Sequence, residues 1–272
     1  MNDFELMRSL PTGQYLPLDS PIHRLDPRIR LLCSLCLISA AIFSTQLWGL
    51  VAGFFILLLG FKLARVPFAL GLKSLLVSIP FILLLALMQI VFNPYVDRGI
   101  LFSLGPLVLS WTDLYIAGLL ILRFVVLMML LNLTSFVLSA SDITVALQSL
   151  LSPLAALRIP VNDLIQIIQV TLRYLPLLTQ TAERIARAQA SRGAAWGASQ
   201  GSLIQRARQI IPLLIPLLTI SLRRAENLAL AMDARAYGIH PQRTCRKVLT
   251  LKIKDAAALV LSIAASLAIL IL

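Results

Sequence analysis

Charged side chains are scarce in this sequence of 272 residues. Only 13% are Asp, Glu, Lys or Arg, against about a quarter in ordinary soluble domains. Hydrophobic residues make up 59% of the chain, and the mean hydropathy is +0.89. A soluble core of this size could not bury so much apolar surface. The composition therefore excludes an ordinary soluble domain and predicts a protein that spans a membrane.

Several catalytic signatures are missing as well. The chain has no G-x-x-x-x-G-K-[ST] loop, so it lacks that route to binding ATP. No H-E-x-x-H, Ser-His-Asp or paired-carboxylate arrangement is present, and His23 and His240 are too far apart for a zinc site. Cys33 and Cys36 lie in an apolar run, where we interpret them as small hydrophobic side chains, and Cys245 is alone. We therefore expect no catalysis, no cofactor and no metal site in this chain.

Long uncharged runs predict the membrane spans. They are Leu31–Phe61, Ser74–Val96, Phe124–Ser141 and Ala256–Leu272. As one helix the first run would be about 46 Å long, well beyond a hydrocarbon core of about 30 Å, so we predict two short spans with a polar turn at Thr45 and Gln46. The total is then five spans. The first three contain no Asp, Glu or His, which leaves a proton- or ion-coupled carrier without its usual relay.

Basic residues next to the spans set the orientation. They lie before the first span and after the second, at Arg24, Arg28, Arg30, Lys62, Arg65 and Lys73. The positive-inside rule places that side, and with it the N-terminus, in the cytosol. Residues 93–113 then form an external hairpin or a partly re-entrant loop. Arg123 lies inside the fourth span, where we interpret it as a structural contact to a backbone carbonyl or a neighbouring helix.

The section from residue 139 to residue 252 differs in kind. From Ser141 to Lys254 there are 15 Lys or Arg against 5 Asp or Glu, so a net +10 of the chain's +12 lies here. Its uncharged pieces are too short to span a bilayer and are interrupted by prolines. We predict an all-α integral membrane protein with about five transmembrane helices: four spans in residues 1–138, a cytosolic, membrane-apposed helix bundle in 139–252, and a last span in 253–272.

An internal repeat lies inside this basic section. The segment Ala182–Arg192 aligns with Ala225–Arg235, 43 residues further on, and both follow the pattern A-E-x-[IL]-A-x-A-x-x-x-R. Pro-Leu-Leu-Thr precedes each copy, at Pro176 and Pro216, and a glycine follows each shortly afterwards. We predict two similar helices, each beginning near the proline and ending near the glycine.

Small residues that recur every four positions predict where the two helices cross. They are Ala182, Ala186 and Ala190 on the first helix and Ser221, Ala225 and Ala229 on the second. Strips of small residues allow two helix backbones to approach closely. We therefore predict a crossed pair that presents Arg192 and Arg235 at two separate tips.

These two arginines also have a plain structural interpretation. The helix dipole favours arginine near a helix C-terminus by about 0.3 to 1 kcal/mol, and a following glycine is a common stop signal. A helix cap would not require the same ten residues before it in both copies, so the repetition favours function. A functional arginine at such a tip would bind a carboxylate in a groove of a partner protein.

Six motifs in order along the chain carry a family resemblance. They are His23-Arg24-Leu25-Asp26-Pro27-Arg28, Phe92-Asn93-Pro94-Tyr95, Leu150-Leu151-Ser152-Pro153-Leu154, Leu172-Arg173-Tyr174-Leu175-Pro176, Ala190-Ser191-Arg192-Gly193 and Met232-Asp233-Ala234-Arg235-Ala236-Tyr237-Gly238. Over nearly its whole length the sequence resembles the transmembrane T component of the energy-coupling factor transporters, the ABC-type importers of vitamins and micronutrients. The arginine motifs of that family, commonly Ala-Arg-Gly, match Ser191, Arg192 and Gly193 and then Ala234, Arg235 and Ala236. Serine replaces the first alanine of one motif, and alanine replaces the glycine of the other.

The resemblance implies a division of labour between subunits. In the family two ABC ATPases bind the coupling helices, with one arginine motif seated in each, while a small membrane subunit called the S component captures the substrate. The T component transmits ATP-driven motion to the S component. For this chain the resemblance implies two ATPase partners and an S component in the bilayer of the plasma membrane. It further implies cytosolic coupling helices and no enzymatic activity of its own.

Two alternatives stay open. One is a T component of a dedicated cobalt, nickel or biotin system rather than of a shared vitamin module. The other is a channel or secondary transporter that acts alone. The net charge of +12 does not indicate nucleic acid, because basic residues beside membrane spans are required by topology and attracted by anionic lipids. The sequence does not specify the substrate, which on the preferred interpretation never contacts this chain.

Overall fold

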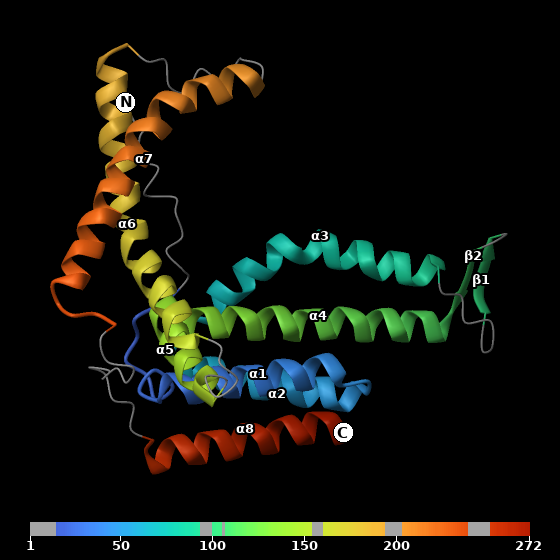
Figure 1. Cartoon of the computed structure of the whole chain (residues 1–272). Coiled ribbons are helices and arrows are strands. Elements are labelled where there is room, and N and C mark those ends of the chain that lie inside the picture. The colour runs from blue at the N-terminus through green and yellow to red at the C-terminus, as the bar shows by residue number, and fades with distance from the viewer. Residues whose placement is uncertain (1–14, 93–99, 105–106, 154–159, 194–202, 239–250) are drawn as a thin grey trace. The chain divides into compact units, whose positions relative to one another are not determined.

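The computed structural model of the chain describes residues 15–92, 100–104, 107–153, 160–193, 203–238 and 251–272 (Figure 1). The helices are α1 (Pro27–Phe43), α2 (Leu47–Ala64), α3 (Phe68–Phe92), α4 (Trp111–Val137), α5 (Ala140–Leu151), α6 (Val161–Ser191), α7 (Leu203–Asp233) and α8 (Ile253–Ile271). Two strands, β1 (Ile100–Leu104) and β2 (Leu107–Ser110), lie between α3 and α4. The expected all-α class is confirmed for the described residues, apart from this hairpin.

The chain divides into two compact units. One contains α1 to α5 and α8, and we call it the membrane unit; the other contains α6 and α7, and we call it the arm unit. The boundary between the two units lies after α5, whereas the predicted cytosolic section begins before α5, at residue 139. The reason is local, because Asp142 in the first turn of α5 is bound by the side chain of Arg30 in α1.

Four described helices, α2, α3, α4 and α8, are long and apolar enough to cross a membrane. The fifth predicted span is α1, which has 17 residues and carries Arg28 and Arg30 in its first turn. The predicted break in the first uncharged run is confirmed, since α1 ends at Phe43 and α2 begins at Leu47. The chain therefore folds this run as two helices and not as one.

The segment before α4 forms the predicted hairpin. Strands β1 and β2 pair in antiparallel register, with Ile100 opposite Ser110 and Leu104 opposite Leu107. The expected turn at Gly105 and Pro106 lies outside the described residues. The structure thus agrees with a hairpin between the third and fourth spans.

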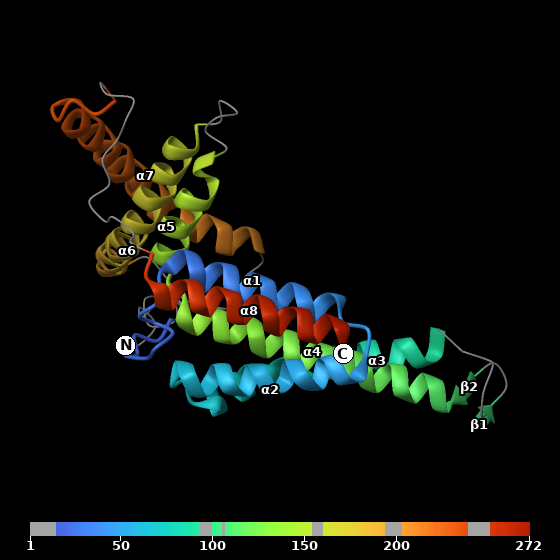
Figure 2. The same cartoon turned by 90° about the horizontal axis from the view of Figure 1, so that it is seen from below.

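The helices of the membrane unit pack along one another. Helix α1 contacts α8 and α4, α2 contacts α4 and α8, and α3 contacts α4, and Figure 2 shows α1, α8, α4 and α2 running side by side. Buried Leu57, Val126 and Met129 lie at the centre of the core. The outward faces are apolar, with Val77 80% and Phe55 65% exposed, as expected for side chains in contact with lipid.

Two glycines one turn apart bring α2 close to α8. A Cβ atom added at Gly49 would overlap the carbonyl oxygen of Ile269, and one added at Gly53 would lie 3.6 Å from the Ile269 side chain. The spacing G-x-x-x-G is typical of membrane helices whose backbones approach closely. Close packing of α2 against α8 therefore depends on the lack of a side chain at these two glycines.

Two arginines in the membrane unit donate hydrogen bonds to backbone carbonyls at helix ends. Arg30 donates to the carbonyl of Val137 at 2.9 Å, and Arg123 donates to the carbonyl of Ser44 at the end of α1. The structural interpretation of Arg123 is thereby confirmed. Both arginines tie α1 to α4, because each residue lies on one of these helices and its acceptor lies at the end of the other.

One buried carboxylate joins the starts of α1 and α8. Asp255 is 3% exposed and accepts from the backbone N–H of Asp26 at 3.1 Å and of Lys252 at 2.8 Å. A carboxylate at a helix N-terminus satisfies N–H groups that lack a partner in the helix and is favoured by the helix dipole. Asp255 does this for two helices at once and so aligns them.

The close approach of α2 and α8 can be tested with one pair of variants. We expect Gly49→Leu to lower the midpoint of thermal unfolding in detergent by about 5 °C or more, because overpacking costs roughly 1 to 3 kcal/mol and here meets backbone. Gly118→Leu on α4 is the matched control, since a Cβ at Gly118 meets nothing within 4 Å. Equal unfolding temperatures for the two variants would contradict the packing described.

Candidate functional site

The repeat in the basic section folds as two long helices of equal length. Helices α6 and α7 have 31 residues each. The expectation that each begins near its proline is wrong, because Pro176 lies inside α6, and Pro212 and Pro216 lie inside α7. A proline inside a helix costs about 3 kcal/mol, so the long apolar stripes of these helices outweigh that cost. The glycine ends are confirmed, since α6 ends two residues before Gly193 and α7 ends shortly before Gly238.

The two helices contact each other at equivalent positions of the repeat. Helix α6 packs against α7, and the guanidinium of Arg224 donates to the hydroxyl of Thr181 at 3.0 Å. These two residues are 43 positions apart, which is the offset of the repeat, so each is the counterpart of the other. The contact therefore joins the same position of the two copies of the repeat.

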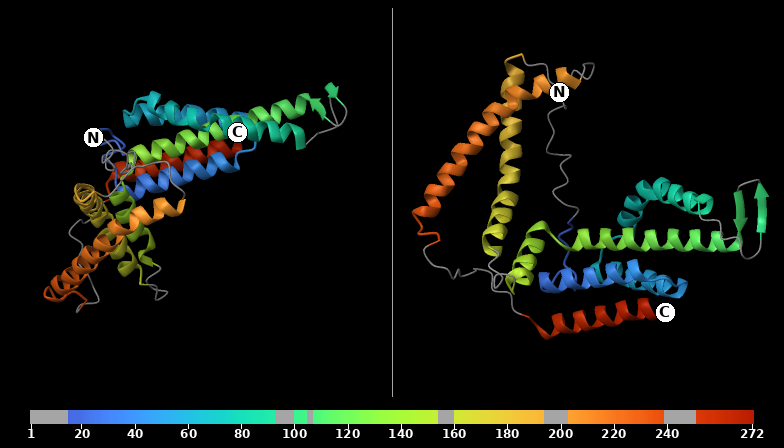
Figure 3. Two further views of the ribbon diagram at one scale, coloured as in Figure 1. Left: turned by 90° about the horizontal axis from the view of Figure 1, so that it is seen from above. Right: turned by 45° about the vertical axis from the view of Figure 1, so that its right-hand side comes forward.

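This position gives the two helices arms of the same length. Arg192 follows Thr181 by 11 residues, and Arg235 follows Arg224 by 11 residues, or about 17 Å along a helix axis. Figure 3 shows α6 and α7 crossing and then diverging toward their ends. All three internal prolines precede the crossing residues, so neither arm contains a kinking residue.

The predicted strips of small residues are placed differently on the two helices. On α6, Ala186 is 3% exposed, and Ala182 and Ala190 are half-buried. On α7, Ser221 is half-buried while Ala225 and Ala229 are exposed. Among residues 211–233 of α7, the half-buried ones are Leu213, Pro216, Leu217, Ile220, Ser221, Arg224, Leu228 and Met232. Burying these larger apolar side chains is more favourable than burying alanine. The buried face of α7 is therefore shifted by one residue from the predicted strip of small residues.

The two tips have the same backbone conformation. At the end of α6, the N–H of Arg192 donates to Gln189 at 3.1 Å and that of Gly193 to Ala190 at 3.0 Å. At the end of α7, the equivalent N–H groups of Arg235 and Ala236 donate to the carbonyls of Met232 and Asp233 at 3.1 and 2.8 Å. The repeat thus extends from sequence to the hydrogen bonds that end each helix.

Both tips also place the residue after the arginine in the left-handed region. Gly193 has φ +85° and Ala236, its counterpart, has φ +57°. This conformation is natural for glycine but costs an L residue about 1 kcal/mol or more. The turn is kept in the second copy despite this cost, which indicates that the shape of the tip matters.

All six predicted tip residues are exposed in the arm unit. They are Ser191, Arg192, Gly193, Ala234, Arg235 and Ala236. Neither guanidinium forms a hydrogen bond or an ion pair with another described residue. Two cations thus project from two identical turns, where each could bind an acidic partner surface with both edges of its guanidinium.

The contact between Thr181 and Arg224 was not anticipated from the sequence. Thr181 immediately precedes the first copy of the repeat, and Arg224 immediately precedes the second. The repeat extended by one residue at its start pairs a threonine, a possible acceptor, with an arginine, a donor. The 43-residue offset therefore already pairs the two residues that form the contact, although the crossing was predicted from the strips of small residues.

The left-handed turns allow a reciprocal test. We expect Gly193→Ala to speed hydrogen exchange of the last amides of α6 about fivefold, because a change of about 1 kcal/mol alters an opening equilibrium by that factor. Ala236→Gly should slow exchange at the end of α7 by a similar factor. Exchange on the full chain measured by mass spectrometry reports both effects, and changes of the same sign in the two variants would contradict the assigned conformations.

Comparisons with known proteins agree with this arrangement. Residues 19–245 match the cobalt transport protein family. The chain is 34% identical over 264 residues to an energy-coupling factor transporter transmembrane protein EcfT of Heliobacterium modesticaldum, covering 94% of each chain. It is 36% identical over 259 residues to the protein of that name from Streptococcus equi subsp. equi, covering 94% of this chain and 93% of the relative. A third EcfT, from Thermosediminibacter oceani, is 30% identical over 256 residues, covering 93% and 94%.

These matches run through the spans, the repeat and both tips, at identities of 30% to 36%. Together with four helices able to cross a bilayer, they identify a multi-pass membrane protein. The chain belongs to the cobalt transport protein family, as an EcfT transmembrane component of energy-coupling factor transporters.

Proposed function

We propose that this chain is the coupling subunit through which partner ABC ATPases drive an S component to import a vitamin or micronutrient. The observation that carries the proposal is the pair of exposed arginines, Arg192 and Arg235, on turns with equivalent hydrogen bonds. Two identical docking points suit two ATPase subunits that are related by approximate twofold symmetry. A single helix cap would need neither the duplication nor the exposure.

The two halves of each arm helix differ in a way that supports two kinds of partner. Before the crossing, exposed side chains are mostly apolar, such as Ile167 at 62% and Leu175 at 47% on α6 and Ile215 and Leu218 at 63% each on α7. With the tip arginines included, the charged residues on α6 increase from two before the crossing to four after it, whereas α7 carries three on each side of Arg224. The exposed apolar side chains before the crossing suit contact with the bilayer or a membrane subunit, and the charged tips suit cytosolic ATPases.

On this proposal the N-terminus, α6 and α7 are cytosolic. The orientation is supported by basic residues beside the spans, including Lys62, Arg65 and Lys73. ATP is available only on that side, so the docking tips must lie there. The arms then carry motion from their tips through the crossing toward the apolar halves.

Charge reversal at the tips tests the coupling role. We expect Arg192→Glu or Arg235→Glu to weaken ATPase binding about a hundredfold or more, because one partner of a buried ion pair is replaced by a like charge. The assembled complex should also hydrolyse ATP without uptake. Co-purification of the ATPases and uptake by whole cells measure the two effects.

Arg184→Glu on α6 and Arg223→Glu on α7 are the matched controls. Both arginines are exposed and lie on the arm helices away from the tips. An exposed charge contributes only about 0 to 1 kcal/mol, so these variants should assemble and transport normally. Unchanged uptake and assembly in both tip variants would disprove the proposal.

Partner identification separates a shared module from a dedicated one. The motif His23 to Arg28 and the five-span layout favour the shared type, so we expect the tagged chain to co-purify with two ATPases and several different S components. Mass spectrometry of the purified complexes measures this. A single S component under all growth conditions would instead favour a dedicated metal or biotin system, and substrate flux through the reconstituted chain alone would favour a stand-alone transporter.

A further inference from the structure

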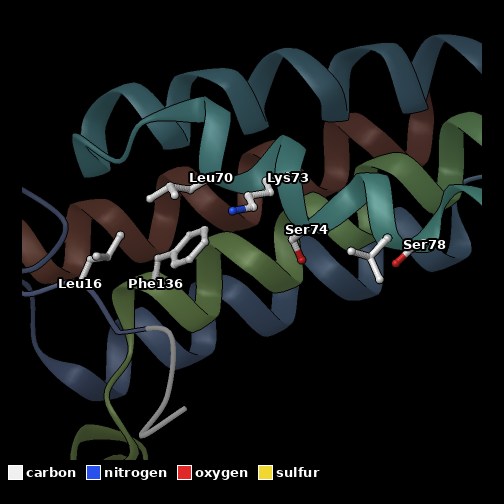
Figure 4. A pocket seen from close by; sticks show the side chains of 7 residues that line it. Leu16, Leu70, Lys73, Ser74, Ser78 and Phe136 are labelled. Atoms are coloured by element: carbon white, nitrogen blue, oxygen red, sulfur yellow. The ribbon is translucent and has the colours of Figure 1, made fainter. Parts of the chain in front are cut away.

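A cavity of about 630 Å³ lies beside α3 in the membrane unit. Its lining residues are Leu16, Leu70, Lys73, Ser74, Val77, Ser78 and Phe136. Figure 4 shows Lys73, Ser74 and Ser78 on α3, with Leu16 and Phe136 from other segments. The volume is within the range of about 300 to 1,000 Å³ typical of ligand sites. The lining combines an apolar surface with one cation and two hydroxyl groups.

Two local features lie next to the cavity. Pro80 lies inside α3, where it removes a backbone hydrogen bond and bends the helix; Figure 1 shows α3 bent along its length beside α4. The segment before α1 closes one end, because the N–H of Leu16 donates to the carbonyl of Phe136 at 3.1 Å. The hydroxyl of Ser74 contacts Asn132 of α4 at 3.1 Å, which holds α3 to α4 at this level.

The charge in this cavity is not balanced by the chain itself. Lys73 is exposed, and the described residues provide no carboxylate within ion-pair distance of it. Helices α2 and α3 contain no Asp or Glu at all, and Lys62 and Arg65 add to the positive charge near their junction. The carboxylate of Asp19, in the segment before α1, faces Arg24 at 4.0 Å.

The position of this cation indicates what balances it. Lys73 lies in the first two turns of a helix able to cross the membrane, next to Val77, which is 80% exposed. An ammonium group at that depth is costly unless it meets an anion at the membrane surface. Anionic lipid headgroups supply such an anion, while the acyl chain of the same molecule covers the apolar side chains.

We propose that this cavity binds an anionic glycerophospholipid of the surrounding bilayer. Its phosphate accepts a charge-assisted hydrogen bond from Lys73, and the hydroxyl of Ser78 donates to a phosphate or ester oxygen. One acyl chain lies against Leu70, Val77 and Phe136. A bound lipid would fill the space beside the N-terminal half of α3.

The assembled complex with its partner subunits, placed in nanodiscs of mixed phosphatidylcholine and phosphatidylglycerol, tests the site. Native mass spectrometry counts the lipids retained after release. We expect the wild type to retain phosphatidylglycerol selectively and Lys73→Gln to retain about fivefold less, since one basic residue near a membrane surface contributes about that factor. Ser78→Leu keeps the charge but fills the cavity and should lose the lipid as well.

Lys62→Gln is the matched control, because it removes the same charge from an exposed position outside the cavity. It should retain phosphatidylglycerol like the wild type. Equal losses in the Lys62 and Lys73 variants would show a diffuse charge effect and overturn the proposal. Displacement of the lipid by millimolar inorganic phosphate, or crosslinking of Lys73 to a protein subunit in the complex, would overturn it in favour of a free anion or a protein occupant.

Discussion

The hydrogen bond between Arg224 and Thr181 marks the point on which the arm unit depends. It joins counterpart residues of two repeats, 43 positions apart at 3.0 Å. Because the contact lies at equivalent positions, the two arms beyond it have equal lengths and end in equal turns. Uninterrupted helix on that side of the crossing makes each arm a stiff rod, whereas the prolines lie on the other side.

In the membrane unit, buried charged side chains bind backbone groups at the ends of neighbouring helices. Arg30 and Arg123 reach backbone carbonyls at the ends of neighbouring helices, and Asp255 binds N–H groups at the starts of two helices. Each of these bonds offsets part of the cost of burying a charged group in an apolar surrounding. The same bonds also fix α1 against α4 and α8.

Features set by short-range chemistry could be predicted from the sequence. The break between α1 and α2 follows from polar residues in a run too long for one span, and the ends of α6 and α7 follow from their glycines. The cost of a charge in a membrane predicted that Arg123 contacts a backbone carbonyl or a neighbouring helix. In each case one local energy term is much larger than its competitors.

Features that depend on three-dimensional packing could not be predicted from the sequence. Pro176 and Pro216 lie inside helices because favourable burial along each helix outweighs a local penalty, and a sequence pattern does not state that balance. The exposed positions of Ala225 and Ala229 depend on how α7 rotates to bury its leucines. The proximity of Gly49 to Ile269 joins residues from opposite ends of the chain, although the spacing of Gly49 and Gly53 gave a hint.

On the proposed function, each arginine tip is seated in an ATPase subunit of an assembled transporter. Photo-crosslinking tests it directly, with a photoreactive amino acid placed at Ser191 or Ala234, beside each arginine, and at Glu226 as a control on the arm. We expect a covalent product with an ATPase subunit from both tip positions and none from the control. Products with the S component alone, or from only one tip, would contradict it.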